Sequence, residues 1–273
     1  MTTQSEVRSL TMPTLFPANP IWGDQRTIHY KENTSFTITF VTEKAAVDPY
    51  MPPGIVVPED PLVIVSYCMC RGIKEMGGTG YNLVSISVAA HFEGEEDHCD
   101  GDLSLVIWES KFPPVVMGRE FLGYPKLVAE IDDPWMGDDR WGWRVSENGT
   151  CFLEAELFDL QRLDDEECRA LTESSVSDFG SGALHMAYKV VPGPNYDDEP
   201  VAAHVCGVVH RDDIREAWAC KGSLAWRPVT PQSCFLFYGI IEALSTLPIV
   251  RYGDCLITKG PHIIEMGNSR RLK

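Results

Sequence analysis

The sequence predicts one mostly-β (α+β) domain with a few short helices. Short alternating or apolar segments recur along the chain, turn residues separate them, and only a few stretches have helical periodicity. The chain has 273 residues, enough for a large core, and 44% of them are apolar, as in a globular protein. Because no repeat or linker is visible, we assign residues 35–273 to a single domain behind an irregular N-terminal arm at residues 1–34.

Strands dominate the first half of the chain. Residues 35–42 alternate, with Phe36, Ile38 and Phe40 on one face, as in a half-buried strand. Apolar and β-branched segments predict further strands at residues 61–70, 81–92 and 103–109. Between these strands we expect a short helix at 43–50, a glycine-rich turn at 77–80, a solvated acidic turn at 93–102, one helical turn at 118–123 and an acidic loop at 130–140.

The second half is predicted to join strands through short turns. Glu147-Asn148-Gly149 separates two alternating segments, 141–145 and 150–158, and Asn-Gly in this position is a strong hairpin signal. Thr230-Pro231 and the apolar spacing after it predict an N-capped helix that ends near Pro248. The remaining expected elements are a surface helix at 163–171, a polar loop at 174–182, strands at 183–191 and 201–209 around a turn at 194–197, and last strands at 254–258 and 262–265.

The charge balance excludes two classes of partner. With 40 acidic and 23 basic residues the net charge is −17, whereas nucleic acids and anionic membrane surfaces both require a basic face. The longest apolar segment, 234–250, is broken by Glu242 and Pro248 and is too short and too polar to span a bilayer. We therefore expect neither nucleic-acid binding nor membrane association.

Cysteine usage points to a reducing compartment. The sequence contains nine cysteines, an odd number, and most of them lie within apolar segments. No cationic segment followed by an apolar one marks a secretory signal at the N-terminus. We therefore predict free, buried thiols and a cytoplasmic location.

Lys126 has little polar sequence around it, since Pro125 precedes it and Leu-Val-Ala follows at 127–129. Loss of hydration among apolar groups penalises an ammonium more than a free amine, and a free amine can attack a carbonyl to form a Schiff base. Pro125 fixes its own φ and biases Tyr124 toward an extended conformation, so the chain enters Lys126 in a defined direction. A solvated surface lysine at the start of a strand is the alternative interpretation.

The residues before Lys126 carry a family signature. Gly118-Arg119-Glu120, followed after a short spacer by Gly123-Tyr124-Pro125-Lys126, resembles the motif of the acetoacetate decarboxylase family, in which the lysine forms a Schiff base with the substrate. Two later stretches, 188–192 and 216–250, resemble family segments in the same order, so the similarity covers nearly the whole chain. The resemblance implies a barrel-like arrangement of antiparallel sheets around the lysine, a homo-oligomer, and chemistry that needs neither a metal nor an organic cofactor.

Several family positions carry different residues in this chain. The family's decarboxylases have a second lysine directly after the first, where this chain has Leu127. Alignment with the family strands places Ser66 where a glutamate is expected, and the second glutamate position falls at Asn82 or Leu83. The family's arginine falls near Asn33, which leaves no cation in register. Ser66 and Asn82 are therefore our candidates for substrate contacts in place of the carboxylates.

Four further residues are candidate site residues. Arg119 and Glu120 match the family's own Arg-Glu pair and are expected to support the lysine or its substrate. Tyr124 directly precedes the Pro-Lys pair and could wall the pocket. His185 lies in a predicted strand, and the resemblance implies that such strands line the pocket.

Metal binding is not supported by the sequence. His204 and Cys206 would share one face of a strand, but a zinc site needs further ligands that the sequence does not supply. The acidic segment at 93–102 fits no calcium loop. We therefore predict no metal site.

The resemblance implies a Schiff-base-forming, decarboxylase-like lyase that acts on a small keto acid or ketone-bearing metabolite through Lys126. The replaced polar residues leave two alternatives open. One is an aldolase, dehydratase or cyclase that uses the same iminium, and the other is a small-molecule-binding member of the fold with an inert lysine. We expect very weak turnover of acetoacetate, because the groups that would orient its carboxylate and transfer the proton are replaced.

Overall fold

The computed structural model of the chain describes residues 26–179, 183–195 and 197–273. Its strands are β1 (Ile28–Val41), β2 (Ile55–Val56), β3 (Leu62–Ile73), β4 (Thr79–Glu93), β5 (His98–Glu109), β6 (Lys126–Val128), β7 (Trp135–Met136), β8 (Arg140–Glu147), β9 (Thr150–Arg162), β10 (Leu184–Val191), β11 (Ala202–Val208), β12 (His210–Asp212), β13 (Glu216–Trp226), β14 (Arg251–Ile264) and β15 (Arg270–Arg271). Its helices are α1 (Lys44–Val47), α2 (Phe112–Met117), α3 (Asp165–Ser174) and α4 (Tyr238–Ser245), with 3₁₀ turns η1 (Asp48–Tyr50) and η2 (Lys74–Met76) and a π-helical turn η3 (Gly118–Leu122). The predicted mostly-β fold with a few short helices is confirmed.

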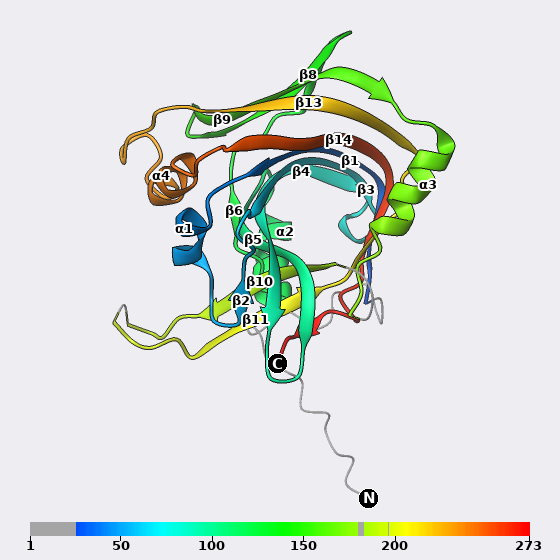
Figure 1. Cartoon of the computed structure of the whole chain (residues 1–273). Helices are drawn as coiled ribbons and strands as arrows, with labels where there is room; N and C mark the ends of the chain where they lie inside the picture. Colours follow the sequence, from blue (N-terminus) through cyan, green and yellow to red (C-terminus); the bar gives the residue numbers. More distant parts are fainter. Residues whose placement is uncertain (1–25, 180–182, 196) are drawn as a thin grey trace, which may run out of the picture.

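The strands form one large, strongly curved sheet (Figure 1). Hydrogen-bonded neighbours follow the order β15-β11-β10-β5-β4-β3-β1-β14-β13-β9-β8-β7. Most pairs are antiparallel, as expected, but β10 and β6 each run parallel to β5, so the sheet is mixed. Within the described residues the path does not close on itself, and α1 and α4 lie at one edge of the curved sheet while α3 lies at the opposite edge (Figure 1).

β1 is a central strand whose alternate side chains enter the core. Phe36, Ile38 and Phe40 are all buried, as the alternation predicts. Phe36 lies opposite Tyr67 of β3 on one side and Ile257 of β14 on the other. The strand therefore connects the two halves of the sheet.

The start of β1 departs from the prediction. The strand begins at Ile28, so residues 28–34 form regular structure where the sequence predicts an irregular arm. Its pairing with β14 shifts register between Tyr30 and Asn33, and such a bulge interrupts the alternation that would reveal a strand. The rest of the predicted arm, residues 1–25, lies outside the described residues, and its assignment stays a prediction.

Local turn chemistry forms two elements as predicted. β8 and β9 join through Asn148 and Gly149, whose φ values of 49° and 75° suit a two-residue hairpin turn. α3 begins after Asp164, whose side chain accepts hydrogen bonds from the backbone of Glu166 and Glu167, while the Glu167 side chain accepts one from the Asp164 backbone. This capping box satisfies N–H groups that the first helical turn leaves free.

The predicted helix from Thr230 is wrong at its start, because α4 begins at Tyr238. The Thr230 hydroxyl does accept a hydrogen bond from the Ser233 backbone at 3.2 Å. That bond closes a turn and not a helix, and Phe235 in this segment is 85% exposed. The apolar spacing after Thr230 therefore does not describe one buried helical face.

Several other elements differ from the sequence prediction. The segment 93–102, predicted as a solvated acidic turn, includes the start of β5 at His98, and the predicted acidic loop at 130–140 contains β7. The two predicted last strands are one strand, β14, which continues through Gly260 and Pro261 because it pairs with β1 along one side and with β12 and β13 along the other. β13 was not predicted. α2 was not predicted either, although prolines in its first turn are compatible with a helix start.

Apolar side chains pack into two clusters. The larger one fills the space between the curved sheet and its helices and includes the fully buried Trp108 and Trp143. The smaller one contains Tyr30, Tyr81 and Tyr124 and borders the site described below. Along β1, residues that line the site, such as Ser35 and Thr37, alternate with residues of the main core, such as Phe36 and Ile38, so the site and the main core lie on opposite faces of this strand.

All nine cysteines lie in the described part of the chain and all are free, as predicted. Across the described ranges, no helix is long and apolar enough to cross a membrane.

Candidate active site

Lys126 is the first residue of β6, and the backbone on both sides of it is fixed. Gly123 ends the helical turn η3 with a φ of 78°, a conformation that glycine adopts without strain. The Ile107 N–H then donates to the Pro125 carbonyl at 3.1 Å. β6 continues parallel to β5 with Lys126 opposite Ile107, so the direction of the lysine side chain follows from the strand register.

Gly118 has to be a glycine because the Lys126 side chain occupies the space where a β-carbon would lie. A Cβ at position 118 would stand 2.5 Å from Cδ and Cε and 2.8 Å from Nζ of Lys126. Arg119 holds the same residue through the backbone, since its Nη1 donates to the Lys126 carbonyl at 3.0 Å. The Gly-Arg pair therefore leaves room for the lysine side chain and fixes its backbone.

Glu109, the last residue of β5, is the ion-pair partner of Lys126. Nζ donates to Oε1 at 2.6 Å, and the two side chains are only 8% and 0% exposed. Oε2 of Glu109 is buried without a hydrogen-bond partner among the described residues. Burial raises the pKa of Glu109 above its ordinary value even though the Lys126 charge opposes this shift. The carboxylate therefore accepts a proton more readily than an exposed glutamate does.

The Lys126 amine borders a cavity of about 510 Å³. Strands β1, β3, β4, β5, β10, β12 and β14 all contribute to its wall. Ser66 and Ser85 provide small polar side chains, whereas Leu83 and Ile107 provide apolar ones. Among the described lining residues, Lys126 is the one lysine or arginine. A cavity of this size suits a small organic molecule.

Three histidines meet in the wall of this cavity: His185 of β10, His210 of β12 and His262 of β14. The His210 ring centroid is 4.3 Å from that of His185 and 5.1 Å from that of His262. The Nδ1 atom of His185 lies 2.9 Å from Asp102, and that of His262 lies 2.8 Å from Asp212. Because an ionised carboxylate only accepts hydrogen bonds, Nδ1 carries the proton in both outer histidines.

The pKa values of His185 and His210 move in opposite directions. Burial acts to lower the pKa of His185, but the charge and hydrogen bond of Asp102 outweigh it and the pKa is raised. Burial lowers the pKa of His210 well below its ordinary value, and the charges of His185, His262 and Lys126 lower it further. His210 is therefore held as a neutral imidazole, whereas His185 beside it gains a proton more readily.

Tyr124 connects this histidine array to the lysine. Its hydroxyl lies 2.9 Å from Nε2 of His210, and the Lys126 amine lies 5.5 Å from the centre of its ring. Burial raises the pKa of Tyr124 well above its ordinary value, so the phenol keeps its proton. A neutral phenol and a neutral imidazole thus share a hydrogen bond beside the amine.

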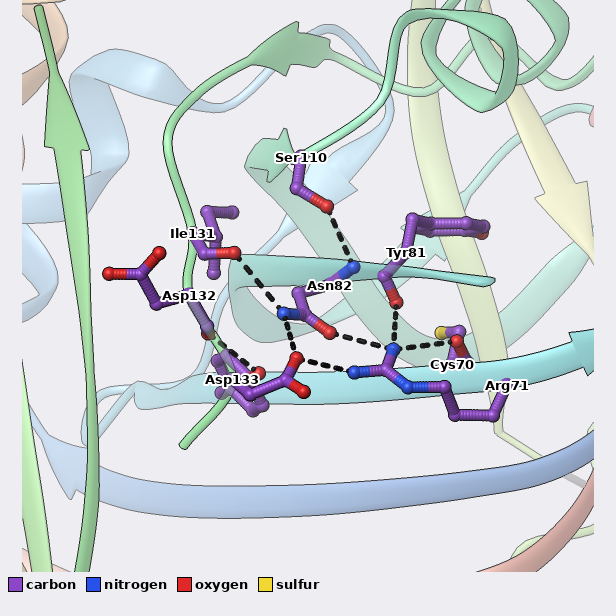
Figure 2. A network of polar contacts seen from close by, with 9 residues as sticks. Cys70, Arg71, Tyr81, Asn82, Ser110, Ile131, Asp132 and Asp133 are labelled. Atoms are coloured by element: carbon purple, nitrogen blue, oxygen red, sulfur yellow. Dashed lines mark hydrogen bonds and ion pairs between the residues drawn. The ribbon is translucent and has the colours of Figure 1, made fainter. Parts of the chain in front are cut away.

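Asn82 belongs to a polar network outside the cavity wall (Figure 2). Arg71 donates to its Oδ1 at 2.9 Å, while its Nδ2 donates to the Ile131 carbonyl at 3.1 Å and to Asp133 at 2.8 Å. Its backbone N–H donates to the Ser110 hydroxyl at 2.9 Å. Figure 2 shows that the network joins β3 and β4 to the residue after β5 and to the segment after β6. It therefore ties together the ends of the two strands that supply the ion pair.

Four of the predicted site residues line the cavity together, namely Ser66, Tyr124, Lys126 and His185. Asn82 does not line it, although the next residue of β4, Leu83, does. The side chains of Arg119 and Glu120 are exposed, and Arg119 contacts the site through the Lys126 carbonyl. Lys126 is buried at a cavity as the sequence predicts.

Sequence reasoning missed Glu109 and both His–Asp pairs. A carboxylate that closes an apolar strand was the available signal for Glu109. The His–Asp pairs have no local signal because strand pairing creates them. His185 lies directly opposite Asp102 in the parallel β10–β5 ladder, and His262 lies directly opposite Asp212 in the β14–β12 ladder.

One group within the described ranges could hold a metal ion, on the β4–β5 hairpin away from the cavity. Potential ligand atoms of His91, Glu93 and His98 all lie within 4.8 Å of one another. Asp100 accepts a hydrogen bond from Nδ1 of His91 at 2.9 Å. These side chains are largely exposed and do not line the Lys126 cavity.

Solved structures share this fold. The acetoacetate decarboxylase of Legionella pneumophila subsp. pneumophila str. Philadelphia 1 is 16% identical, with a TM-score of 0.72 and coverage of 94% of this chain and 88% of that chain. A further acetoacetate decarboxylase structure is 16% identical, with a TM-score of 0.73 over 100% of this chain and 98% of that chain. The enduracididine biosynthesis enzyme MppR complexed with pyruvate is 13% identical, with a TM-score of 0.62 over 90% of each chain.

At sequence identities this low, the structural similarity shows a common fold and nothing more. No curated protein sequence matches the chain. The sequence model of acetoacetate decarboxylase does match it, over residues 11–255, which include the lysine motif and nearly all of the sheet. The chain therefore belongs to the acetoacetate decarboxylase family.

Proposed function

We propose that the protein is a Schiff-base-forming lyase that acts on a keto acid or ketone-bearing metabolite, with Lys126 as the nucleophile. The observation that carries the proposal is the buried Lys126 amine, which borders a cavity and lies 2.6 Å from the carboxylate of Glu109. A structural ion pair has no need of a cavity. An amine that must meet a small carbonyl compound does.

The Lys126–Glu109 pair suits the formation of an imine. Proton transfer from the ammonium to Glu109 frees the nitrogen lone pair, and the raised pKa of Glu109 favours that transfer. The amine then adds to the substrate carbonyl, and a proton passes from the nitrogen to the oxygen to give a carbinolamine. The proton held by Glu109 returns to that hydroxyl, which leaves as water while the nitrogen lone pair forms the iminium. The resulting iminium accepts the electron pair of a neighbouring bond, so loss of carbon dioxide from a β-keto acid would give an enamine.

Borohydride trapping tests this proposal. The protein is incubated with pyruvate or acetoacetate, reduced, digested and examined by mass spectrometry. We expect the added mass on the peptide that contains Lys126. Lys126→Ala should abolish the label, and Lys126→Arg should abolish it too because a guanidinium stays protonated. Lys74→Ala, which removes an exposed lysine of η2, is the matched control and should leave the label unchanged.

The binding-protein alternative makes the opposite prediction. If these compounds bind but no label forms on Lys126, and if Lys126→Ala binds them as well as the wild type, the lysine is not a nucleophile. The proposed lyase would then be refuted in favour of a small-molecule-binding protein.

A second candidate is an aldolase, dehydratase or cyclase that uses the same iminium without decarboxylation. Leu127 and the cavity lining favour it, because among the described lining residues no arginine or second lysine is available to hold a substrate carboxylate before it leaves. MppR has been crystallised with the condensation product of pyruvate and imidazole 4-carboxaldehyde. Carbon dioxide release from acetoacetate, measured against condensation of pyruvate with an aldehyde, separates the two candidates, and we expect very weak acetoacetate turnover.

Assembly and location complete the proposal. We expect a homo-oligomer, as the family resemblance implies, and a cytoplasmic location. Light scattering that gives a mass near 30.5 kDa at micromolar concentration would contradict the oligomer.

A further inference from the structure

His210 occupies a position that imine formation by Lys126 and Glu109 does not explain. It lies between two histidines that are each held by a carboxylate, and among the described residues no carboxylate pairs with it. Its side chain reaches the Tyr124 hydroxyl, 2.9 Å from Nε2, and Tyr124 in turn lies against Lys126. A hydrogen bond thus joins the histidine array to Tyr124, whose ring lies beside the Lys126 amine.

We infer that Tyr124 and His210 form a proton-transfer pair that adds and removes the proton at the carbon next to the Lys126 iminium. The inference rests on the proposed function, because it requires the iminium. In this proposal Tyr124 is the catalytic residue, because its side chain lines the cavity beside Lys126, and His210 acts through it. The His185–Asp102 and His262–Asp212 pairs position His210 between them.

The step balances in both directions. As the proton leaves carbon, it passes to the Tyr124 oxygen while the Tyr124 proton passes to Nε2 of His210. The electron pair of the broken C–H bond becomes the enamine double bond, and the iminium π electrons move onto nitrogen. The positive charge moves from the iminium to the His210 imidazolium. Reprotonation of the enamine reverses each transfer.

The charges around His210 favour this exchange. The positive charge of Lys126 is one of the influences that lower the pKa of His210, after burial and the two histidines. When the iminium becomes a neutral enamine, this repulsion disappears at the moment His210 receives the proton. The same repulsion returns when the proton goes back to carbon, so His210 does not retain it.

Carboxylates near the array are already engaged. Asp102 is held by His185 and Asp212 by His262, and these partners lower the pKa of both acids despite their burial. Glu109 accepts a hydrogen bond from the lysine nitrogen itself. Among these groups, the Tyr124 hydroxyl is the one that both meets the cavity and is linked to a free imidazole.

Deuterium exchange into the methyl group of pyruvate tests the inference. Exchange is followed by NMR in D₂O, and borohydride trapping of pyruvate is measured on the same samples. We expect Tyr124→Phe and His210→Asn to trap pyruvate but to exchange its protons about 10²-fold or more slowly, the usual contribution of general acid–base catalysis. Tyr124→Phe keeps the ring that packs on Lys126, so it remains informative if His210→Asn does not fold. His204→Asn, a histidine outside the cavity, is the control and should exchange at the wild-type rate.

The two measurements keep the failures apart. If the wild type traps no pyruvate, the proposed function and this inference both fail. If the wild type traps pyruvate but does not exchange its protons, or if Tyr124→Phe exchanges them within about threefold of the wild type, the proton-transfer pair is refuted and the Schiff-base proposal stands. Equal loss of trapping and exchange in Tyr124→Phe would also refute it, because the residue would then serve imine formation.

Discussion

Replacement of Gly118 by alanine should disable the lysine without unfolding the protein. The new methyl group would stand 2.5 Å from Cδ and Cε of Lys126 and 2.8 Å from its Nζ. Carbon atoms in contact normally lie about 3.5–4.0 Å apart, so the lysine stem has to move by about 1 Å or more. The free direction is into the cavity, which takes the amine away from its position 2.6 Å from Glu109.

The effect of Gly118→Ala on stability should be much smaller than its effect on the reaction rate. Overpacking a core position costs about 1–3 kcal/mol, and a stem that can move into a cavity places this substitution near the lower end. Alanine also improves helix propensity by up to about 1 kcal/mol, so the net change in unfolding free energy should be small. A misplacement of about 1 Å at a reacting group can cost about 10²-fold in rate. We therefore expect Gly118→Ala to lower the rate of pyruvate trapping about 100-fold.

The assay compares the initial rate of borohydride trapping with the unfolding free energy from urea titration. Gly239→Ala in α4 is the matched control, because a Cβ there would meet nothing within 4 Å. It should keep the wild-type trapping rate. A Gly118→Ala protein that traps pyruvate at the wild-type rate would show that the lysine side chain does not depend on the space above Gly118.

Three further predictions follow from single contacts. Glu109→Gln removes the proton acceptor of Lys126, so trapping at neutral pH should slow by about 10²–10⁴-fold, and an unchanged rate would exclude Glu109 as the base. Asn82→Ala leaves the buried Ile131 carbonyl without its side-chain donor and removes the bonds to Arg71 and Asp133. It should lower the unfolding free energy in urea by about 1–3 kcal/mol, whereas a neutral effect would mean that water replaces the network. Hydrogen bonding from Arg270 holds the pKa of Asp97 at about 2, against an ordinary 3.8. That pair stabilises the fold fully above the unfolded pKa and loses its effect as the pH falls through the folded one. The melting temperature of the wild type should thus fall more steeply from pH 4 to 2 than that of Asp97→Asn, and parallel curves would contradict the assignment.

Patterns that depend on neighbouring residues predicted the fold well. Alternation located β1, apolar and β-branched segments located β3, β4 and β5, Asn148-Gly149 located the β8–β9 hairpin, and a charged segment located α3. Each of these signals arises within a few residues, where the chain's own geometry determines the pattern. Prediction failed at the β1 bulge and at Thr230, where a local signal was interrupted or ended in a turn.

The site was harder to predict because strand pairing assembles it. The motif located Lys126 and Tyr124, but Asp102 and His185 are 83 residues apart and become neighbours only in the β5–β10 ladder. Asn82 illustrates a different failure. Side chains alternate between the faces of a strand, so an alignment that differs by one residue exchanges the cavity wall, at Leu83, for the polar network outside it.

The parallel pairing of β5 with β6 has a consequence for how such a protein can change its substrate. Lys126 lies opposite Ile107, and Glu109 is two residues farther along the same strand face, so backbone hydrogen bonds set the spacing of the nucleophile and its base. The groups that meet the rest of a ligand come mainly from other strands, which pair elsewhere in the sheet. Substitutions on those strands can alter recognition without disturbing the reactive pair. A fold organised in this way can diverge widely in sequence, exchange one ligand for another, and keep its chemistry in place.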